Sequence, residues 1–357
     1  MIESINVMSI KPSFKPSWID RFNDWVKELP LSAWLFYLIF GLVLVGVQLL
    51  FLRIEGGQQD SEILPVIIFN GLFTPFLLAL IYLLDDQAVA ALNSMRPVLD
   101  TTESEFEQVR YMLSNMPSRA SLIAGLTMMI LAILMERFWI EPVRYAALGQ
   151  VRTLGQLPIF AILFNIIDKS SAFLFGAFIY HTIRQLRLIN TINMTHIHIN
   201  LHNLGPLQAF SRLTASTAVG LVVGVYGWLL INPDLLADPL IFGFVGLTTI
   251  LAVALFALPL FGVHRLMKKE KERMLHALDL DFETVFSKFN KGFRDNDYSA
   301  TEQLHGTIAG LEIQQNRIMA IPTWPWRPET AQFILAALAL PMVLMILRFL
   351  VEQAFTW

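Results

Sequence analysis

The sequence predicts an all-α, polytopic membrane protein: a helical bundle with seven spans, a cytoplasmic N-terminus and an outer C-terminus. Three observations lead to this fold class. Hydrophobic residues make up 55% of the 357-residue chain and charged residues only 15%, whereas soluble domains carry roughly 25% charged residues. Several apolar runs are long enough to cross a bilayer. The Lys and Arg residues are distributed unevenly between the loops that join these runs.

Each predicted span is a run of about 20 mostly apolar residues, the length that a helix needs to cross the hydrocarbon core. The runs are 31–52, 63–84, 120–135, 157–183, 215–231, 240–263 and 333–351. The first run is too long for the core of a signal peptide, and no small-residue cleavage site follows it. We therefore expect it to stay in the protein as a span.

Positive charge predicts the orientation. With the N-terminus inside, the outer segments hold only Arg53, Arg137, Arg144 and Arg152, and nearly all other Lys and Arg residues fall in inner segments. Loops rich in Lys and Arg stay in the cytoplasm. We therefore expect the chain to lie in the plasma (cytoplasmic) membrane with its N-terminus in the cytoplasm.

Four segments follow from this layout. They are a cytoplasmic amphipathic helix in 1–30, the first six spans in 31–263, a cytoplasmic helical hairpin in 264–330, and the last span with a short outer tail in 331–357. The N-terminal helix has Ser17 as a plausible N-cap and two tryptophans, so it either lies on the membrane surface or packs on the cytoplasmic domain. A second inner helix is predicted to begin with a capping box at Asp100 and Glu103.

Four consecutive polar residues, Asp168, Lys169, Ser170 and Ser171, interrupt the fourth run and are the candidate ligand pocket. Ionisable residues at membrane depth cost free energy and commonly mark function. If they lie deep, we expect a ligand or ion pocket in the outer half of the bundle, and Asp168 and Lys169 each need another partner because neighbours on a helix do not face each other. Alternatively the span begins near Asp168, and 157–167 is a separate interfacial or re-entrant piece.

The seventh run supplies the candidate pore and hinge residues. Pro341 bends a helix, Phe333 opens the run, and Arg348 and Glu352 stand four residues apart near its outer end. If this span lines a pore, the two charged residues form a ring at its outer mouth. Otherwise they form an ion pair with each other at the surface.

Three histidines, His196, His198 and His202, are candidates for sensing. Histidine is the commonest metal ligand and titrates near neutral pH. No carboxylate lies within the stretch and the spacing matches no well-specified metal site, so we expect no metal. A proton-sensing role and a solvated or packed polar face remain open, and the second is the simpler interpretation.

No catalytic site is expected, because the sequence contains no nucleophile elbow, phosphate loop, metalloprotease motif or paired intramembrane aspartates. With no cysteine, thiolate chemistry is excluded, and no cofactor is expected. The net charge of −3 gives no case for a nucleic-acid partner. The expected partners are the lipid bilayer, further copies of the chain, and a small molecule or ion.

The layout resembles that of the insect gustatory and odorant receptor channels: seven spans, a cytoplasmic N-terminus, a long inner loop before the last span and almost no tail after it. The resemblance implies a tetramer held by inner helices, with span seven lining a cation pore. The signature of that family, a Thr-Tyr pair followed by apolar residues and Gln-Phe, is not found here, since Gln332 and Phe333 precede the span. No residue role is therefore carried over.

Three functions are consistent with these features. The first is an oligomeric ion channel with span seven at the pore and a ligand pocket in the bundle. The second is a secondary transporter, because spans two and four contain polar residues and helix breakers such as Asn70 and Pro75 around a possible midplane site. The third is a membrane sensor or scaffold that docks a cytoplasmic partner on its hairpin.

Overall fold

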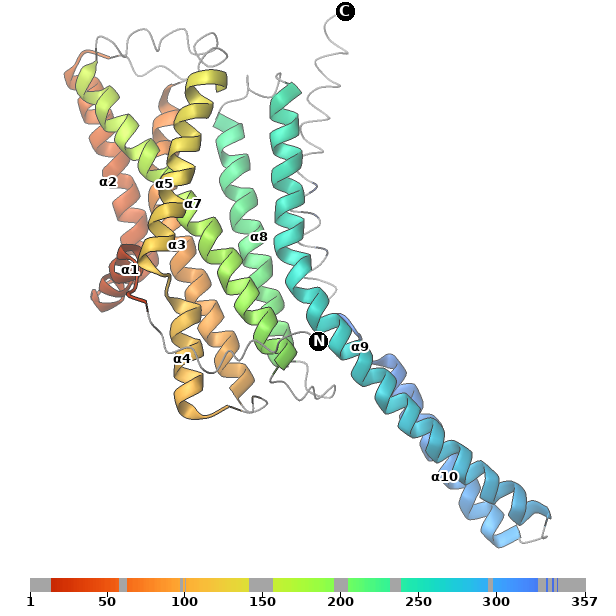
Figure 1. The fold of residues 1–357 in the computed structure, drawn as a ribbon. Coiled ribbons are helices and arrows are strands. Elements are labelled where there is room, and N and C mark those ends of the chain that lie inside the picture. Colours follow the sequence, from red (N-terminus) through yellow and green to blue (C-terminus); the bar gives the residue numbers. More distant parts are fainter. Residues whose placement is uncertain are drawn as a thin grey trace, which may run out of the picture.

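The computed structural model describes residues 14–57, 63–96, 99, 101–140, 157–195, 205–231, 239–294, 298–326, 332, 336 and 339. The described part is all-helical and contains no β-sheet (Figure 1). Its elements are α1 (Trp18–Glu28), α2 (Ala33–Ile54), α3 (Ile63–Met95), α4 (Glu103–Ser114), α5 (Ser118–Met135), the π-helical turn η3 (Glu136–Ile140), α7 (Pro158–Thr195), α8 (Gly205–Ile231), α9 (Pro239–Arg294) and α10 (Tyr298–Ala320).

Six of the described helices, namely α2, α3, α5, α7, α8 and α9, are long and apolar enough to cross a membrane. They cover the first six predicted runs to within two residues at each start, and they indicate an integral membrane protein. The seventh run, 333–351, lies outside the described residues except for 336 and 339. The seventh span and the orientation of the bundle stay predictions.

Three of the membrane helices continue well beyond their apolar runs at the same end of the bundle, the end where α1 and α4 lie (Figure 1). Helix α3 extends to Met95 and α7 is unbroken from Pro158 to Thr195. Residues 158–167 are therefore part of α7 and not a separate piece, and the depth of Asp168 in the membrane stays a prediction. The polar residues 168–171 do not break α7, because the backbone hydrogen bonds of a helix do not depend on the side chains.

Helix α1 begins with a complete capping box: the Asp20 amide donates to the Ser17 hydroxyl, and the Ser17 amide donates to Asp20 Oδ2. Ile19 and Val26 are buried against the bundle, whereas Trp18 and Trp25 remain 43% and 47% exposed. The helix therefore packs on α2 and α3 through one face and leaves aromatic side chains at its other face.

The start of α4 differs from the prediction. Thr102 is the N-cap, and its capping box is closed by Glu105 rather than by the pair Asp100 and Glu103. A Thr side chain two residues further along offers the same acceptor, so two overlapping matches to the motif exist and the sequence pattern alone does not separate them. The helix ends at Ser114, and Pro117 is the N-cap of α5.

Close backbone approach holds α5 against α7. A Cβ atom added at Gly176 would lie 2.5 Å from the Ala124 carbonyl oxygen, and one at Gly125 would lie 2.5 Å from the Phe173 ring. Small residues of this kind let two membrane helices pack tightly without a hydrophobic driving force. Gly220 does the same between α8 and α3, where an added Cβ would meet Leu80.

Helix α9 leaves the bundle as one continuous helix, and α10 returns antiparallel to it, so that the two form a projecting hairpin (Figure 1). Leu278 and Ile318 are buried between them. Lys271 closes the C-terminal end of α10 by donating to the carbonyl oxygens of Met319 and Ile321 at 2.7 and 2.9 Å.

Candidate ligand cavity and buried polar contacts

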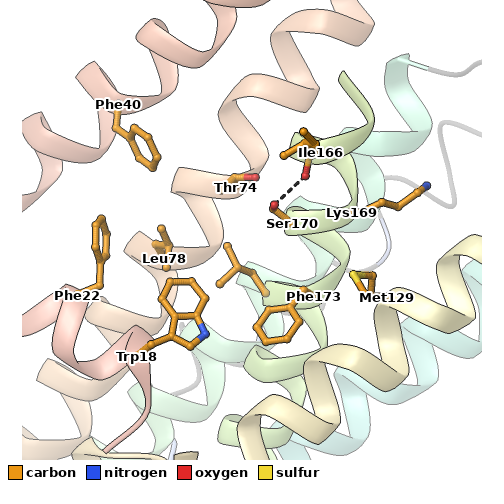
Figure 2. A pocket seen from close by; sticks show the side chains of 11 residues that line it. Trp18, Phe22, Phe40, Thr74, Leu78, Met129, Ile166, Lys169, Ser170 and Phe173 are labelled. Carbon is orange, nitrogen blue, oxygen red and sulfur yellow. Dashed lines mark hydrogen bonds between the residues drawn. The ribbon is translucent and has the colours of Figure 1, made fainter. Parts of the chain in front are cut away.

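A cavity of about 540 Å³ lies between α1, α2, α3, α5 and α7. Its wall is mostly apolar and aromatic, with Trp18, Phe22, Phe40 and Phe173 around it (Figure 2). The ring centroids of Trp18 and Phe173 are 6.2 Å apart. The volume falls in the range of about 300–1,000 Å³ that is usual for sites that bind small molecules.

The hydroxyl groups that line the cavity opposite α1 already have hydrogen-bond partners. The Ser170 hydroxyl donates to the Ile166 carbonyl oxygen at 2.7 Å. The Thr74 hydroxyl pairs with that of Ser171 at 2.6 Å. Because these groups have partners, they attract a polar ligand only weakly, and the cavity favours an apolar occupant.

The four predicted pocket residues share helix α7 but face two places. Lys169 and Ser170 line the large cavity. Asp168 and Ser171 line a second, much smaller pocket of about 30 Å³, which Asn70 also lines from α3. The smaller pocket has room for about one water molecule.

Lys169 is held between two carboxylates. Its ammonium group donates to Asp168 at 2.8 Å and to Glu136 of η3. The expectation that Asp168 and Lys169 cannot meet is wrong, because the long Lys stem bends back to its neighbour. The partner Glu136 was not predicted, since it stands 33 residues away on another helix.

The depth of this ion-pair cluster follows from helix geometry. The amide groups of Ile159 and Phe160 donate to Glu55 at 2.9 and 3.0 Å, which places the start of α7 level with the end of α2. Lys169 is nine residues beyond Phe160, or about 14 Å along the α7 axis at 1.5 Å per residue. Helix α7 is tilted in Figure 1, so the depth below the end of α2 is smaller than this.

A layer of polar side chains joins α2, α3 and α7. Asn70 of α3 donates to Gln48 Oε1 of α2 at 3.0 Å and to the Phe164 carbonyl oxygen of α7 at 3.2 Å. Thr74 and Ser171 continue the layer, and Pro75 lies inside α3 beside it. These hydrogen bonds fix three apolar helices in register, since an unpaired polar group in hydrocarbon costs several kcal/mol.

A second polar cluster is buried where α3 and α7 leave the apolar region. Asp85 Oδ1 accepts from His181 Nε2 at 2.6 Å and from Gln185 Nε2 at 2.7 Å. Gln185 also donates to the Leu113 carbonyl oxygen at 2.9 Å, which ties α4 to α7. His181 is fully buried. The sequence analysis missed this cluster, although an ionisable residue inside an apolar run is itself a signal.

Arg184 and Asp20 join the turn between α4 and α5 to the rest of the protein. Arg184 donates to the carbonyl oxygens of Met112 and Asn115 at 2.7 and 2.6 Å. Asp20 Oδ2 accepts from the Met116 amide at 2.9 Å in addition to its cap bond. Burial raises the pKa of the Asp20 carboxyl above its usual value of 3.8, and these hydrogen bonds offset part of the rise.

The Pro-rich segment after α10 packs on α9. The His264 ring stacks on Trp324 with centroids 3.9 Å apart, and His264 Nδ1 lies 2.9 Å from the Thr323 carbonyl oxygen. Trp326 stacks on Trp324 in turn. The segment that leads toward the seventh run is thus fixed to the helix that forms the sixth.

The remaining candidates are not placed by the structure. The sensing candidates His196, His198 and His202 and the pore or hinge candidates Phe333, Pro341, Arg348 and Glu352 lie outside the described residues. Within the described ranges, no group of three His, Asp or Glu side chains is arranged to hold a metal ion.

Comparison with known proteins gives no relative: no family model, no curated protein and no solved structure matches the chain.

Proposed function

We propose that the protein is a ligand-gated membrane channel, whose ligand binds in the cavity between α1, α2, α3, α5 and α7. The observation that carries the proposal is the cavity itself, because it combines a ligand-sized volume with an apolar wall. The cavity opens to the surface of the bundle, where Trp18 and Ile166 are exposed. Its residues come from five helices, so an occupant contacts most of the described bundle at once.

Helix α1 is suited to sense the occupant. Trp18 and Phe22 line the cavity, while Asp20 on the same short helix bonds the Met116 amide between α4 and α5. A ligand that moves α1 therefore moves the α4–α5 turn. Helix α7 is bound to the same turn through Arg184.

The pore belongs to the seventh run in this proposal. Several copies assemble around 333–351, with Phe333 and Pro341 along the pore and Arg348 and Glu352 at its outer mouth. The stacked His264 and Trp324 support this arrangement, because they join the end of the hairpin to α9 directly before the seventh run. Symmetric closed rings are the usual form of such assemblies.

The test fills the cavity. Ser170→Phe places a ring in the cavity, and Ile123→Phe, at a residue of α5 that is 64% exposed, is the matched control. The two variants and the parent chain are reconstituted in nanodiscs for light scattering and in liposomes for ion flux. We expect a closed oligomer of three or more subunits, and a ligand response that only Ser170→Phe abolishes. A monomer without ion flux contradicts the channel.

One observation favours a transporter as the second candidate. The layer of Asn70, Thr74 and Ser171 beside Pro75 is a polar site in mid-bundle with a helix breaker, which is where transporters bind their substrates. Substrate uptake into liposomes that is lost in Asn70→Leu, in a protein that is monomeric by light scattering, supports the transporter over the channel. Uptake that survives both Asp168→Asn and Lys169→Ala contradicts a substrate site at Asp168 and Lys169.

A further inference from the structure

The backbone brings positive charge together at the end of the cavity that α1 closes. The Ser17 amide donates to the Met116 carbonyl oxygen at 3.1 Å, and the Ser118 amide donates to the Lys15 carbonyl oxygen at 3.1 Å. This short two-stranded contact places Lys15 beside the first turn of α5, where Arg119 follows Ser118. Three cations of this region are exposed, namely Lys15, Arg21 and Arg119.

None of these three cations has an acidic partner among the described residues. Two other exposed cations at the same end of the bundle are paired: Lys27 with Asp24 at 3.0 Å, and Arg110 with Glu107 at 3.2 Å. Arg21 makes only a hydrogen bond to the Ser17 carbonyl oxygen, at 3.4 Å. An unpaired cluster of Lys and Arg at a membrane surface attracts anionic lipid headgroups.

The cluster is continuous with the cavity through α1. Trp18 lines the cavity, and Arg21, three residues later, lies on the neighbouring side of the same helix. Lys169 is the charged residue of the cavity wall, and its ammonium group is already paired with two carboxylates. The hydroxyl groups of Thr74 and Ser170 are also bonded, and the rest of the wall is aromatic and aliphatic. The site is thus mostly apolar along the helices and positively charged at the membrane surface, which matches the apolar chains and the charged headgroup of an anionic phospholipid.

We propose that the cavity binds an anionic phospholipid of the leaflet on the α1 side, with one acyl chain along Trp18 and Phe173 and its phosphate at Lys15, Arg21 and Arg119. The inference rests on the proposed function, since it names the ligand of the same cavity. The distribution of Lys and Arg assigns this side to the cytoplasm, whose leaflet carries the anionic lipids.

The test measures contact between the lipid chain and Trp18. The full chain is placed in phosphatidylcholine nanodiscs that contain a fraction of brominated lipid, which is either phosphatidylglycerol or phosphatidylcholine with brominated acyl chains. Bromine quenches tryptophan fluorescence on contact. The chain has eight tryptophans, so the signal is the difference between the parent and Trp18→Phe. We expect quenching of Trp18 at a much lower fraction of brominated phosphatidylglycerol than of brominated phosphatidylcholine.

The variants test binding of the lipid headgroup and binding of the acyl chain separately. Each surface cation contributes about fivefold to binding, so replacing Lys15, Arg21 and Arg119 by Gln reduces the preference for phosphatidylglycerol on the order of 100-fold at low salt. Arg110→Gln, which removes an exposed but paired cation, leaves the preference unchanged. Ser170→Phe removes the Trp18 quenching without removing the cations. Intrinsic-fluorescence melting checks that each variant is folded.

Equal quenching by the two brominated lipids overturns the proposal, as does a preference that survives in the triple Gln variant. Quenching of Trp18 that persists in Ser170→Phe also overturns it, because the chain then lies outside the cavity. The readout needs no ion flux. If the protein binds the anionic lipid but conducts no ions, this inference stands and the proposal of a channel is refuted. If ion flux depends on the cavity but the protein shows no preference for the anionic lipid, only this inference is refuted.

Discussion

The buried contact between Asp85 and His181 offers the sharpest test of how the bundle is held together. Replacing Asp85 by Leu removes the one oxygen that accepts from both His181 Nε2 and Gln185 Nε2. Two buried donors then lose their acceptor, at about 1–3 kcal/mol each. Breaking a buried pair by removing one partner costs about 3–5 kcal/mol in other proteins. We therefore expect Asp85→Leu to lower the free energy of unfolding by about 4 kcal/mol.

Asp85→Asn separates the acceptor from the charge. It keeps an oxygen at the same position, so the two hydrogen bonds survive as neutral ones, each weaker by about 1 kcal/mol than a bond to a charged group. We expect a loss of about 2 kcal/mol, half that of Leu. Asp86→Leu is the matched control, because Asp86 is the next residue and is exposed. Its effect is expected to stay within about 0.5 kcal/mol.

The assay is unfolding by sodium dodecyl sulfate in mixed micelles, followed by intrinsic fluorescence. The eight tryptophans report on the whole bundle, and the absence of cysteine prevents disulfide cross-linking during unfolding. The order of the three variants in free energy of unfolding tests the role of the Asp85 hydrogen bonds. If Asp85→Leu is no less stable than Asp85→Asn, the hydrogen bonds to His181 and Gln185 do not stabilise the fold. If Asp86→Leu is as damaging as Asp85→Leu, burial of Asp85 is not the cause.

Three further predictions address other contacts. Burial raises the pKa of Asp20, so the folded chain holds the carboxyl proton more tightly than the unfolded chain does. The contribution of the protonated Asp20 carboxyl to stability is therefore present below about pH 3.8 and is lost as the pH rises through the folded pKa. We expect Asp20→Asn to reduce the pH dependence of the melting temperature in this acid range. Glu55→Ala removes the acceptor of two amides at the start of α7 and should cost about 1–2 kcal/mol, with faster hydrogen exchange confined to that turn; unchanged exchange contradicts the capping role. Gly176→Leu forces α5 away from α7 and should lower the melting temperature strongly, whereas Gly246→Ala, where an added Cβ meets nothing within 4 Å, should not.

The sequence predicts the helices well because the bilayer imposes a length and a composition on each one. It predicts their ends less well. Asp85 and Asp86 suggest the end of the second span, yet α3 continues to Met95 because Asp85 is buried against α7 instead of facing water. The residues after it contain no Gly or Pro before Pro97, a signal that would have found the extension.

The contacts of the candidate site depend on pairs far apart in the sequence, which periodicity within one helix does not report. The sequence singles out Asp168 to Ser171 as one group, but their division between two pockets follows from the helical rotation of successive residues and from the helices that surround α7. Glu136 was not recognised as the partner of Lys169, because the apolar run of α5 ends just before it and the residue resembles a simple boundary charge.

The position of α1 links the cavity to the polar cluster in a way that neither feature shows alone. One face of this short helix carries Trp18 against the cavity, and the other carries Asn23, which accepts from the Tyr37 hydroxyl of α2 at 2.8 Å. Three of the described buried atoms without a hydrogen-bond partner belong to these residues: Asp20 Oδ1, Asn23 Nδ2 and His181 Nδ1. Each such atom costs free energy unless a water molecule or a ligand group pairs with it. A helix that reports on an occupied cavity requires two arrangements, and these unpaired atoms are the groups of α1 and α7 whose hydrogen bonds would distinguish them.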